Sequence, residues 1–124
     1  MAFLVLAMLL IPLVFLGIGL LWKKRPPRKI NWAYGYRTRR STASQQAWDF
    51  AHRYFAKLAL WTGAILLLGT AAAIVAAMSV ASDEGLKTAA LYCTLVQSIA
   101  LFVPIIVAEA RLRKEFDEEG KPKK

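Results

Sequence analysis

Apolar residues gather in three long blocks along this chain, and the charged residues lie between the blocks. The blocks cover about residues 2–22, about 58–81 and about 86–108. As an α-helix rising about 1.5 Å per residue, each block is long enough to cross a hydrocarbon layer of roughly 30 Å. The pattern therefore predicts an all-α membrane protein with three transmembrane helices, folded as a single domain over residues 1–124.

The first block contains no charged residue, and no positively charged segment precedes it. It is followed by Lys23-Lys24-Arg25, and no small-residue cleavage site is present. We therefore expect a retained transmembrane helix and not a signal peptide. Pro12 lies inside this block. A proline there is tolerated in lipid as a kink, provided that a neighbouring group satisfies the carbonyl that it frees.

The second and third blocks differ in the residues that interrupt them. The second is rich in glycine and alanine, and small residues let helix backbones approach closely. We therefore expect it at the centre of the bundle. The third contains Gln97, the only amide deep inside a predicted span. A hydrogen bond between helices is the simpler explanation of Gln97, and a ligand contact is the alternative.

Lysine and arginine are distributed unevenly between the segments that flank the spans. Ten lie in residues 23–57 and six follow Ala108, whereas residues 82–87 hold only Lys87. The positive-inside rule then places residues 23–57 and the tail, residues 109–124, in the cytoplasm, and the N-terminus outside. This topology explains the formal net charge of +9. Anionic lipid headgroups at the cytoplasmic face are therefore the expected partner, and nucleic acid is not.

The segment of residues 23–57 contains residues that end one helix and residues that begin another. Pro26-Pro27 should end the first helix. The run Thr42-Ala43-Ser44-Gln45 fits a capping box, which predicts Thr42 as N-cap and a helix from near Ala43. Apolar residues then recur at helical spacing, at Ala47, Trp48, Ala51, Phe55 and Leu58. This pattern favours an amphipathic helix at the membrane surface that leads into the second span, with or without a break.

Several residues of this segment are candidates for a binding site at the inner headgroup level. The guanidinium of Arg37 suits bidentate contact with phosphate or carboxylate, and Gly35 lets backbone approach a ligand closely. The candidate ligand-binding residues are Asn31, Gly35, Tyr36, Arg37, Thr38, Ser41, Trp48, His52 and Glu109. The structural alternative is that Asn31 and Arg37 hold the loop to helix ends and that Trp48 is an interfacial anchor.

These residues also occur in an order that resembles a known family. The residues are Asn31-Trp32-Ala33-Tyr34-Gly35-Tyr36-Arg37-Thr38, then Ser41, Ser44, Trp48 and Ala51-His52-Arg53-Tyr54-Phe55-Ala56-Lys57. Over about residues 26–80 they resemble the signature of the SdpI family, small bacterial membrane proteins named for an immunity protein against a secreted killing peptide. His52 departs from the asparagine usual in that family, and Arg39-Arg40 stand where a proline often follows the threonine.

The resemblance implies a bacterial cell-membrane protein in toxin immunity or membrane signalling. It would bind a peptide toxin, a lipid headgroup or a membrane-recruited regulator through the Gly-Tyr-Arg-Thr segment. Assembly into a homo-oligomer is a further option. The alternative function is a small membrane enzyme or transporter that acts on a lipid or peptide at the inner headgroup level.

Catalytic and metal chemistry have little support in the residue pattern. His52 and Asp49 are close enough on one helix to meet, but no nucleophile accompanies them, so a surface pair is the favoured interpretation. Glu109 is expected to pair with Arg37 or Arg53 across the bundle. No metal site or cofactor is expected, because the single cysteine of the chain belongs to the outer half of the third span. The tail should extend the third helix and end in a disordered Gly-Lys-Pro-Lys-Lys.

Overall fold

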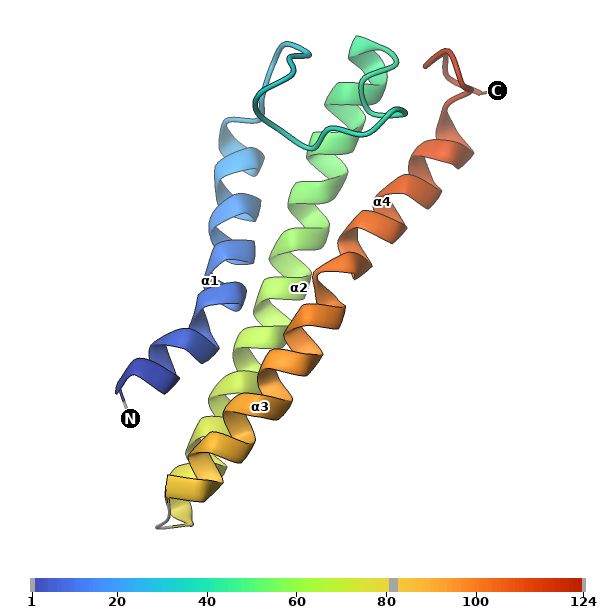
Figure 1. Cartoon of the computed structure of the whole chain (residues 1–124). Helices are drawn as coiled ribbons and strands as arrows, with labels where there is room; N and C mark the ends of the chain where they lie inside the picture. Colours follow the sequence, from blue (N-terminus) through green and yellow to red (C-terminus); the bar gives the residue numbers. More distant parts are fainter. Residues whose placement is uncertain (1, 81–82, 124) are drawn as a thin grey trace.

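A computed structural model of the chain describes residues 2–80 and 83–123. The described residues form the helices α1 (Ala2–Lys24), α2 (Gln45–Ser79), α3 (Asp83–Ala100) and α4 (Phe102–Glu115), drawn in Figure 1. Three helical segments are long and apolar enough to cross a membrane, namely Ala2–Lys24, Gln45–Ser79 and Glu84–Glu115. The predicted all-α fold with three spans is confirmed.

Helix α2 is the centre of the bundle, as the small residues of the second block predicted. It contacts α1, α3 and α4 (Figure 1). Close approach to α1 depends on glycine on both helices. A Cβ at Gly63 would lie 2.9 Å from Leu16 Cγ, and one at Gly19 would lie 2.6 Å from Leu60 Cγ. The backbones of α1 and α2 can therefore pack more tightly than side chains at these positions would allow.

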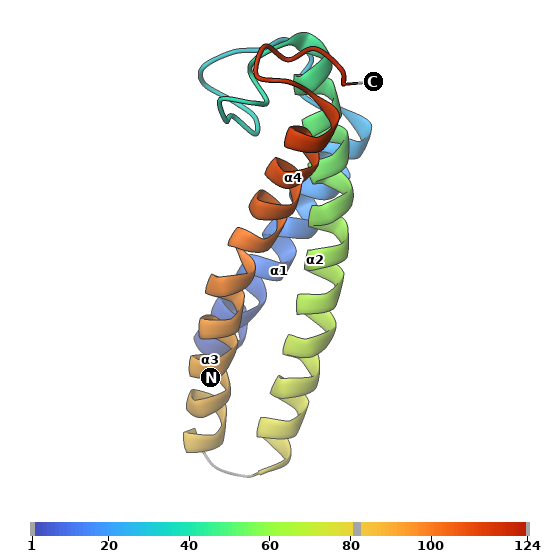
Figure 2. The same ribbon diagram turned by 90° about the vertical axis from the view of Figure 1, so that its right-hand side faces the viewer.

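The loop of residues 25–44 and the tail of residues 116–123 lie at the same end of the bundle, which we call the loop end. Figure 2 shows both segments beside the first turns of α2, far from the N-terminus of α1. The predicted amphipathic helix is continuous with the second span, because α2 is one helix of 35 residues. Its first turns therefore lie level with the loop, and the rest forms the central span.

The predicted capping box was wrong, because α2 begins at Gln45 and its N-cap is Ser44. Ser44 Oγ accepts a hydrogen bond from the N–H of Ala47 at 3.0 Å. The hydroxyl of Thr42 instead donates to the carbonyl of Thr38 at 2.7 Å, and the Gln45 amide donates to Asp49 Oδ1 at 2.9 Å. Serine and threonine are both good N-caps, and here a competing turn had already engaged Thr42.

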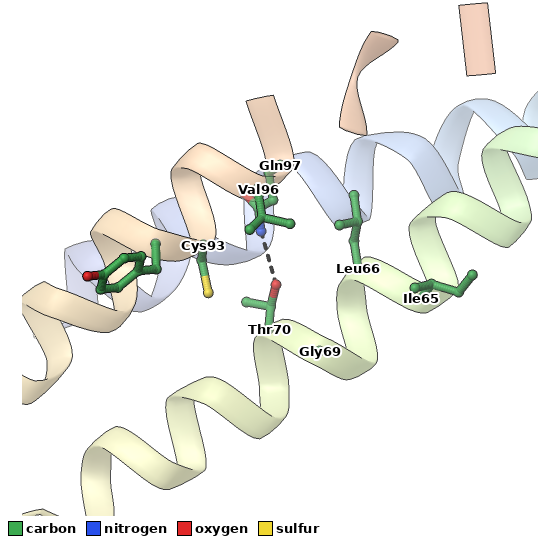
Figure 3. A pocket seen from close by; sticks show the side chains of 8 residues that line it. Ile65, Leu66, Gly69, Thr70, Cys93, Val96 and Gln97 are labelled. Carbon is green, nitrogen blue, oxygen red and sulfur yellow. Dashed lines mark hydrogen bonds between the residues drawn. The ribbon is translucent and has the colours of Figure 1, made fainter. Parts of the chain in front are cut away.

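Pro12 and Gln97 are coupled across the bundle. Pro12 has no N–H to donate to the carbonyl of Met8, one turn earlier in α1. The side-chain amide of Gln97 in α3 donates to that carbonyl at 2.8 Å. It also donates to Thr70 Oγ1 of α2 at 3.0 Å, the bond marked in Figure 3. Gln97 is buried, with 2% of its surface exposed. The interhelical hydrogen bond expected for Gln97 is confirmed, and it joins all three spans.

A second proline divides the third span. Pro104 cannot donate to the carbonyl of Ala100, and the helix is interrupted at Leu101 between α3 and α4. The two helices still follow one another as a single apolar segment (Figure 1). α4 continues to Glu115, which confirms the prediction that the tail extends the third helix beyond residue 108.

The disorder predicted for the end of the tail was wrong over the residues that the structure describes. Phe116 is buried and forms an isolated β-bridge with Pro122. Gly120 has a φ of +82° and its carbonyl accepts a hydrogen bond from Ser44 Oγ at 2.6 Å. The tail therefore folds back over the beginning of α2. The hydroxyl of the N-cap residue Ser44 both caps that helix and holds the tail.

The coupling of Pro12 and Gln97 predicts a measurable interaction energy. Gln97→Leu should lower the free energy of unfolding by about 1–2 kcal/mol, because it leaves the Met8 carbonyl without a donor in an apolar site. In a Pro12→Ala background the same substitution should cost less, since residue 12 can then donate to Met8. Reversible unfolding of the four variants in mixed micelles measures the difference.

Ser98→Ala is the matched control, because that hydroxyl is exposed and bonds within its own helix to the carbonyl of Thr94. It should change stability by less than about 0.5 kcal/mol. Strictly additive effects of Pro12→Ala and Gln97→Leu would contradict the coupling.

Candidate functional site at the loop end

Gly35 allows the loop to cross directly over the first turns of α2. Its φ is +118°, a value that favours glycine. A Cβ at this position would lie 2.7 Å from His52 Nε2 and 2.9 Å from Trp48 Cη2. The close backbone approach predicted for Gly35 is therefore made to side chains of the same chain.

His52 is fully buried, and both nitrogens of its ring are engaged. Nδ1 lies 2.8 Å from the carbonyl of Trp48, and Nε2 accepts a hydrogen bond from the backbone N–H of Tyr36 at 2.8 Å. An accepting Nε2 requires a neutral ring with its proton on Nδ1. In this tautomer His52 donates to the Trp48 carbonyl within α2 and ties the loop to α2 through the N–H of Tyr36.

Tyr36 extends this attachment to α4. Its hydroxyl donates to Glu109 Oε1 at 2.7 Å, and its ring stacks on Phe55 with centroids 5.0 Å apart. Burial, together with the neighbouring Glu109 carboxylate, raises the pKa of Tyr36 above its ordinary value. The hydroxyl therefore stays protonated and remains a donor to the carboxylate.

Trp48 completes the attachment on the other side of the loop. Its side chain is fully buried, and Nε1 donates to the carbonyl of Pro27 at 2.8 Å. The rings of Trp48 and His52 are in contact, with centroids 4.3 Å apart. Trp48 is therefore a packed core residue, and the alternative of an interfacial anchor was wrong. We call Tyr36, Trp48, His52 and Glu109 the loop clasp.

Thr38 and Ser41 form a turn within the loop. The N–H of Thr38 donates to Ser41 Oγ at 2.8 Å, and the N–H of Ser41 donates to Thr38 Oγ1 at 3.1 Å. Ser41 is fully buried and its hydroxyl donates to the carbonyl of Tyr36 at 2.9 Å. These bonds satisfy the backbone N–H groups of Thr38 and Ser41 and the carbonyl of Tyr36. Both residues therefore act in folding the loop.

Asn31 and Arg37 hold the outer part of the loop, although neither reaches a helix end as the structural alternative expected. Asn31 Oδ1 accepts from the N–H groups of Ala33 and Tyr34 at 2.9 and 2.6 Å. The guanidinium of Arg37 donates to the carbonyl of Trp32, and the side chain is otherwise exposed. Both residues bond within the loop and shape its surface.

The expected ion pair of Glu109 with Arg37 or Arg53 was wrong. Glu109 accepts from Tyr36, and no ion pair within residues 2–80 and 83–123 includes it. Asp49 likewise bonds to Gln45 and not to His52. Over the same ranges no group of three histidine, cysteine or acidic side chains is arranged to hold a metal ion.

Sequence reasoning missed Trp22 and the partner that it finds in the loop. Trp22 Nε1 donates to the hydroxyl of Tyr34 at 2.8 Å, and its ring meets that of His52 edge-on at 4.9 Å. A buried tryptophan needs an acceptor for its N–H, so its place at the end of the first span was the available signal. Trp22 thus connects α1 to the loop and to the clasp.

Several large loop side chains remain exposed, among them Tyr34, whose hydroxyl nevertheless accepts the bond from Trp22. Trp32 is the most exposed large apolar residue of the loop, with 82% of its surface accessible. Arg37 lies against the backbone of Trp32 through its hydrogen bond. Together with the exposed Ile30 and Tyr34 these residues form what we call the outer loop face. Of the predicted site residues, Tyr36, Trp48, His52 and Glu109 form the loop clasp, and Arg37 belongs to the exposed surface. Asn31, Gly35, Thr38 and Ser41 shape the loop between them.

Gly35→Ala should lower the free energy of unfolding by about 2 kcal/mol or more, because the new Cβ is strained by the positive φ and overlaps His52 and Trp48. Gly17→Ala is the matched control, since a Cβ at Gly17 meets nothing within 4 Å. It should stabilise α1 by about 0.5–1 kcal/mol. Unfolding in micelles and the rate of trypsin cleavage in the loop measure both effects, and equal behaviour of the two variants would refute the close approach.

Tyr36→Phe should cost about 1.5–3 kcal/mol, because it removes a hydrogen bond to a carboxylate. In a Glu109→Leu background the same change should cost much less, since the acceptor is already absent. Tyr92→Phe is the control, because the side chain of Tyr92 is exposed on α3. A double-mutant cycle on unfolding free energies gives the coupling, and a value near zero would contradict the bond.

Known proteins share part of this sequence. The model for the SdpI/YfhL protein family matches residues 28–108, which include all of the loop clasp except Glu109. Over 57 residues the chain is 47% identical to the uncharacterized protein YfhL of Bacillus subtilis (strain 168), covering 42% of this chain and 52% of that protein. The chain thus spans about half the length of this curated relative, and no solved structure matches it. The chain belongs to the SdpI/YfhL family, and its three apolar helices make it a multi-pass membrane protein.

Proposed function

We propose that this chain is a membrane interaction protein of the toxin-immunity or signalling kind, which binds a peptide or a partner protein through the outer loop face. Membership of the SdpI/YfhL family supports this class of function. The observation that carries the proposal is the exposure of Trp32, at 82% of its surface, in a loop whose neighbouring residues are held tightly on α2.

The chemistry of the outer loop face suits recognition of a chain segment. Tryptophan and arginine are enriched among residues that dominate binding energies, because they combine large contact area with directed hydrogen bonds. The guanidinium of Arg37 lies beside Trp32 and can bind a carboxylate. The partner is therefore expected to present an apolar side chain next to an acidic group.

The loop clasp supports such binding by holding the loop in one conformation. A loop that is ordered before binding loses less conformational entropy when the partner arrives. Gly35 and Tyr36 fix the chain on α2, and Ser41 holds the Tyr36 carbonyl within the loop, whereas Trp32 stays outside these contacts. The residues that hold the loop on α2 thus keep Trp32 in a fixed position for binding.

The proposal places the outer loop face in the cytoplasm, because the loop and the tail carry most of the basic residues. A membrane-recruited regulator, or a peptide inserted at the inner surface, would meet this face. Support for the alternative of an enzyme or transporter is weaker, since His52 and Glu109 are bonded to Tyr36 while Arg37 faces outward.

Expression in a bacterium that is sensitive to a secreted killing peptide tests the proposal. The wild-type chain should raise survival, and Trp32→Ala combined with Arg37→Gln should abolish the gain while membrane insertion is kept. Loss of one dominant contact costs about 2 kcal/mol, which corresponds to roughly 30-fold weaker binding.

The matched control combines Tyr92→Ala in α3 with Lys114→Gln in α4, which removes an exposed aromatic side chain and one exposed cation from helices outside the loop. It should protect as well as the wild type. In addition, a photo-reactive amino acid at position 32 should cross-link to the labelled peptide or to a protein, and cross-linking should require Arg37. Absence of protection together with cross-links to lipid alone would overturn the proposal.

A further inference from the structure

A cavity lies between α1 and α2 at the loop end. It has a volume of about 410 Å³ and is lined by Trp22, Lys23, Arg53, Ala56, Lys57 and Leu60. Two neighbouring hollows share its cations, one through Arg53 and Lys57 and the other through Lys23 and Lys57. The three basic residues therefore surround one continuous region of the surface, with α1 contributing one and α2 two.

These three cations have no carboxylate partner within the part of the chain that the structure describes. The ion pairs found there join other residues, in α3, in α4 and in the tail. Asp49, one turn before Arg53 on α2, accepts its hydrogen bond from Gln45. Arg53 and Lys57 are themselves one turn apart, a spacing at which like charges repel. An anion bound between them would relieve that repulsion.

The rest of the cavity is apolar and continues toward the spans. Ala56 and Leu60 lie on α2 at the predicted start of the second span, and Trp22 lies at the predicted end of the first. Lysine and arginine at such a boundary keep their charges at the headgroup level while their stems cover apolar surface. The cavity thus offers positive charge at its mouth and an apolar wall beneath it.

We propose that this cavity binds an anionic phospholipid. The phosphate is held by Lys23, Arg53 and Lys57, and one acyl chain lies against Trp22, Ala56 and Leu60. The apolar wall favours a phospholipid over a soluble phosphate, which would use only the cations. The site stands on its own residues and does not depend on the function proposed for the outer loop face.

Competition between spin-labelled lipids tests the site on the full chain in nanodiscs. Phosphatidylglycerol should be retained over phosphatidylcholine by about tenfold or more, since each cation near an anionic group contributes roughly a fivefold change. The triple variant Lys23→Gln, Arg53→Gln and Lys57→Gln should bring the ratio close to one. If that variant does not fold, Lys57→Gln alone should lower the ratio severalfold.

The control is the triple variant Arg28→Gln, Lys29→Gln and Arg39→Gln, which removes the same charge from exposed positions of the loop. It should keep the preference for phosphatidylglycerol. An equal loss in both triple variants would show diffuse attraction by net charge and would overturn the proposal. Displacement of the labelled lipid by millimolar inorganic phosphate would reassign the cavity to a soluble anion and would likewise overturn it.

Discussion

The hydrogen bond from the backbone N–H of Tyr36 to Nε2 of His52 fixes the position of the loop on the bundle. It requires the backbone to lie directly on α2, and only glycine at position 35 leaves room for that approach. Once the backbone is there, the Tyr36 ring stacks on Phe55 and its hydroxyl reaches Glu109 on α4. One buried imidazole thereby determines how the loop, the central helix and the last helix meet.

This arrangement explains why a short polar motif serves two purposes. Gly35, Tyr36 and Thr38 make contacts within the protein, whereas Arg37, in the middle of the same run, is exposed. The residues with internal contacts specify where the loop lies, and Arg37 is available to another molecule. The cations at the mouth of the α1–α2 cavity form a separate surface at the same end.

The spans and the role of Gln97 could be predicted from the sequence, because lipid imposes two strong rules. Apolar residues must cover a fixed length, and a polar group within that length must find a partner. The loop could not be predicted in the same way. His52 bonds to a backbone N–H sixteen residues earlier, and a sequence shows no signal for the position of a backbone group. The N-cap was mistaken because two hydroxyl residues only two positions apart, Thr42 and Ser44, compete for it. The fold of the tail depends on the Ser44 hydroxyl, which reaches Gly120.

The amide of Gln97 has a consequence for how the protein assembles in the bilayer. The carbonyl that Pro12 frees in α1 receives its donor from α3, and the same amide also bonds to Thr70 of α2. If α1 and α2 were inserted without α3, the Met8 carbonyl would lack its donor in hydrocarbon, which is unfavourable. The three helices therefore depend on one another, and α1 reaches its final hydrogen-bonded state only when α3 has entered the membrane.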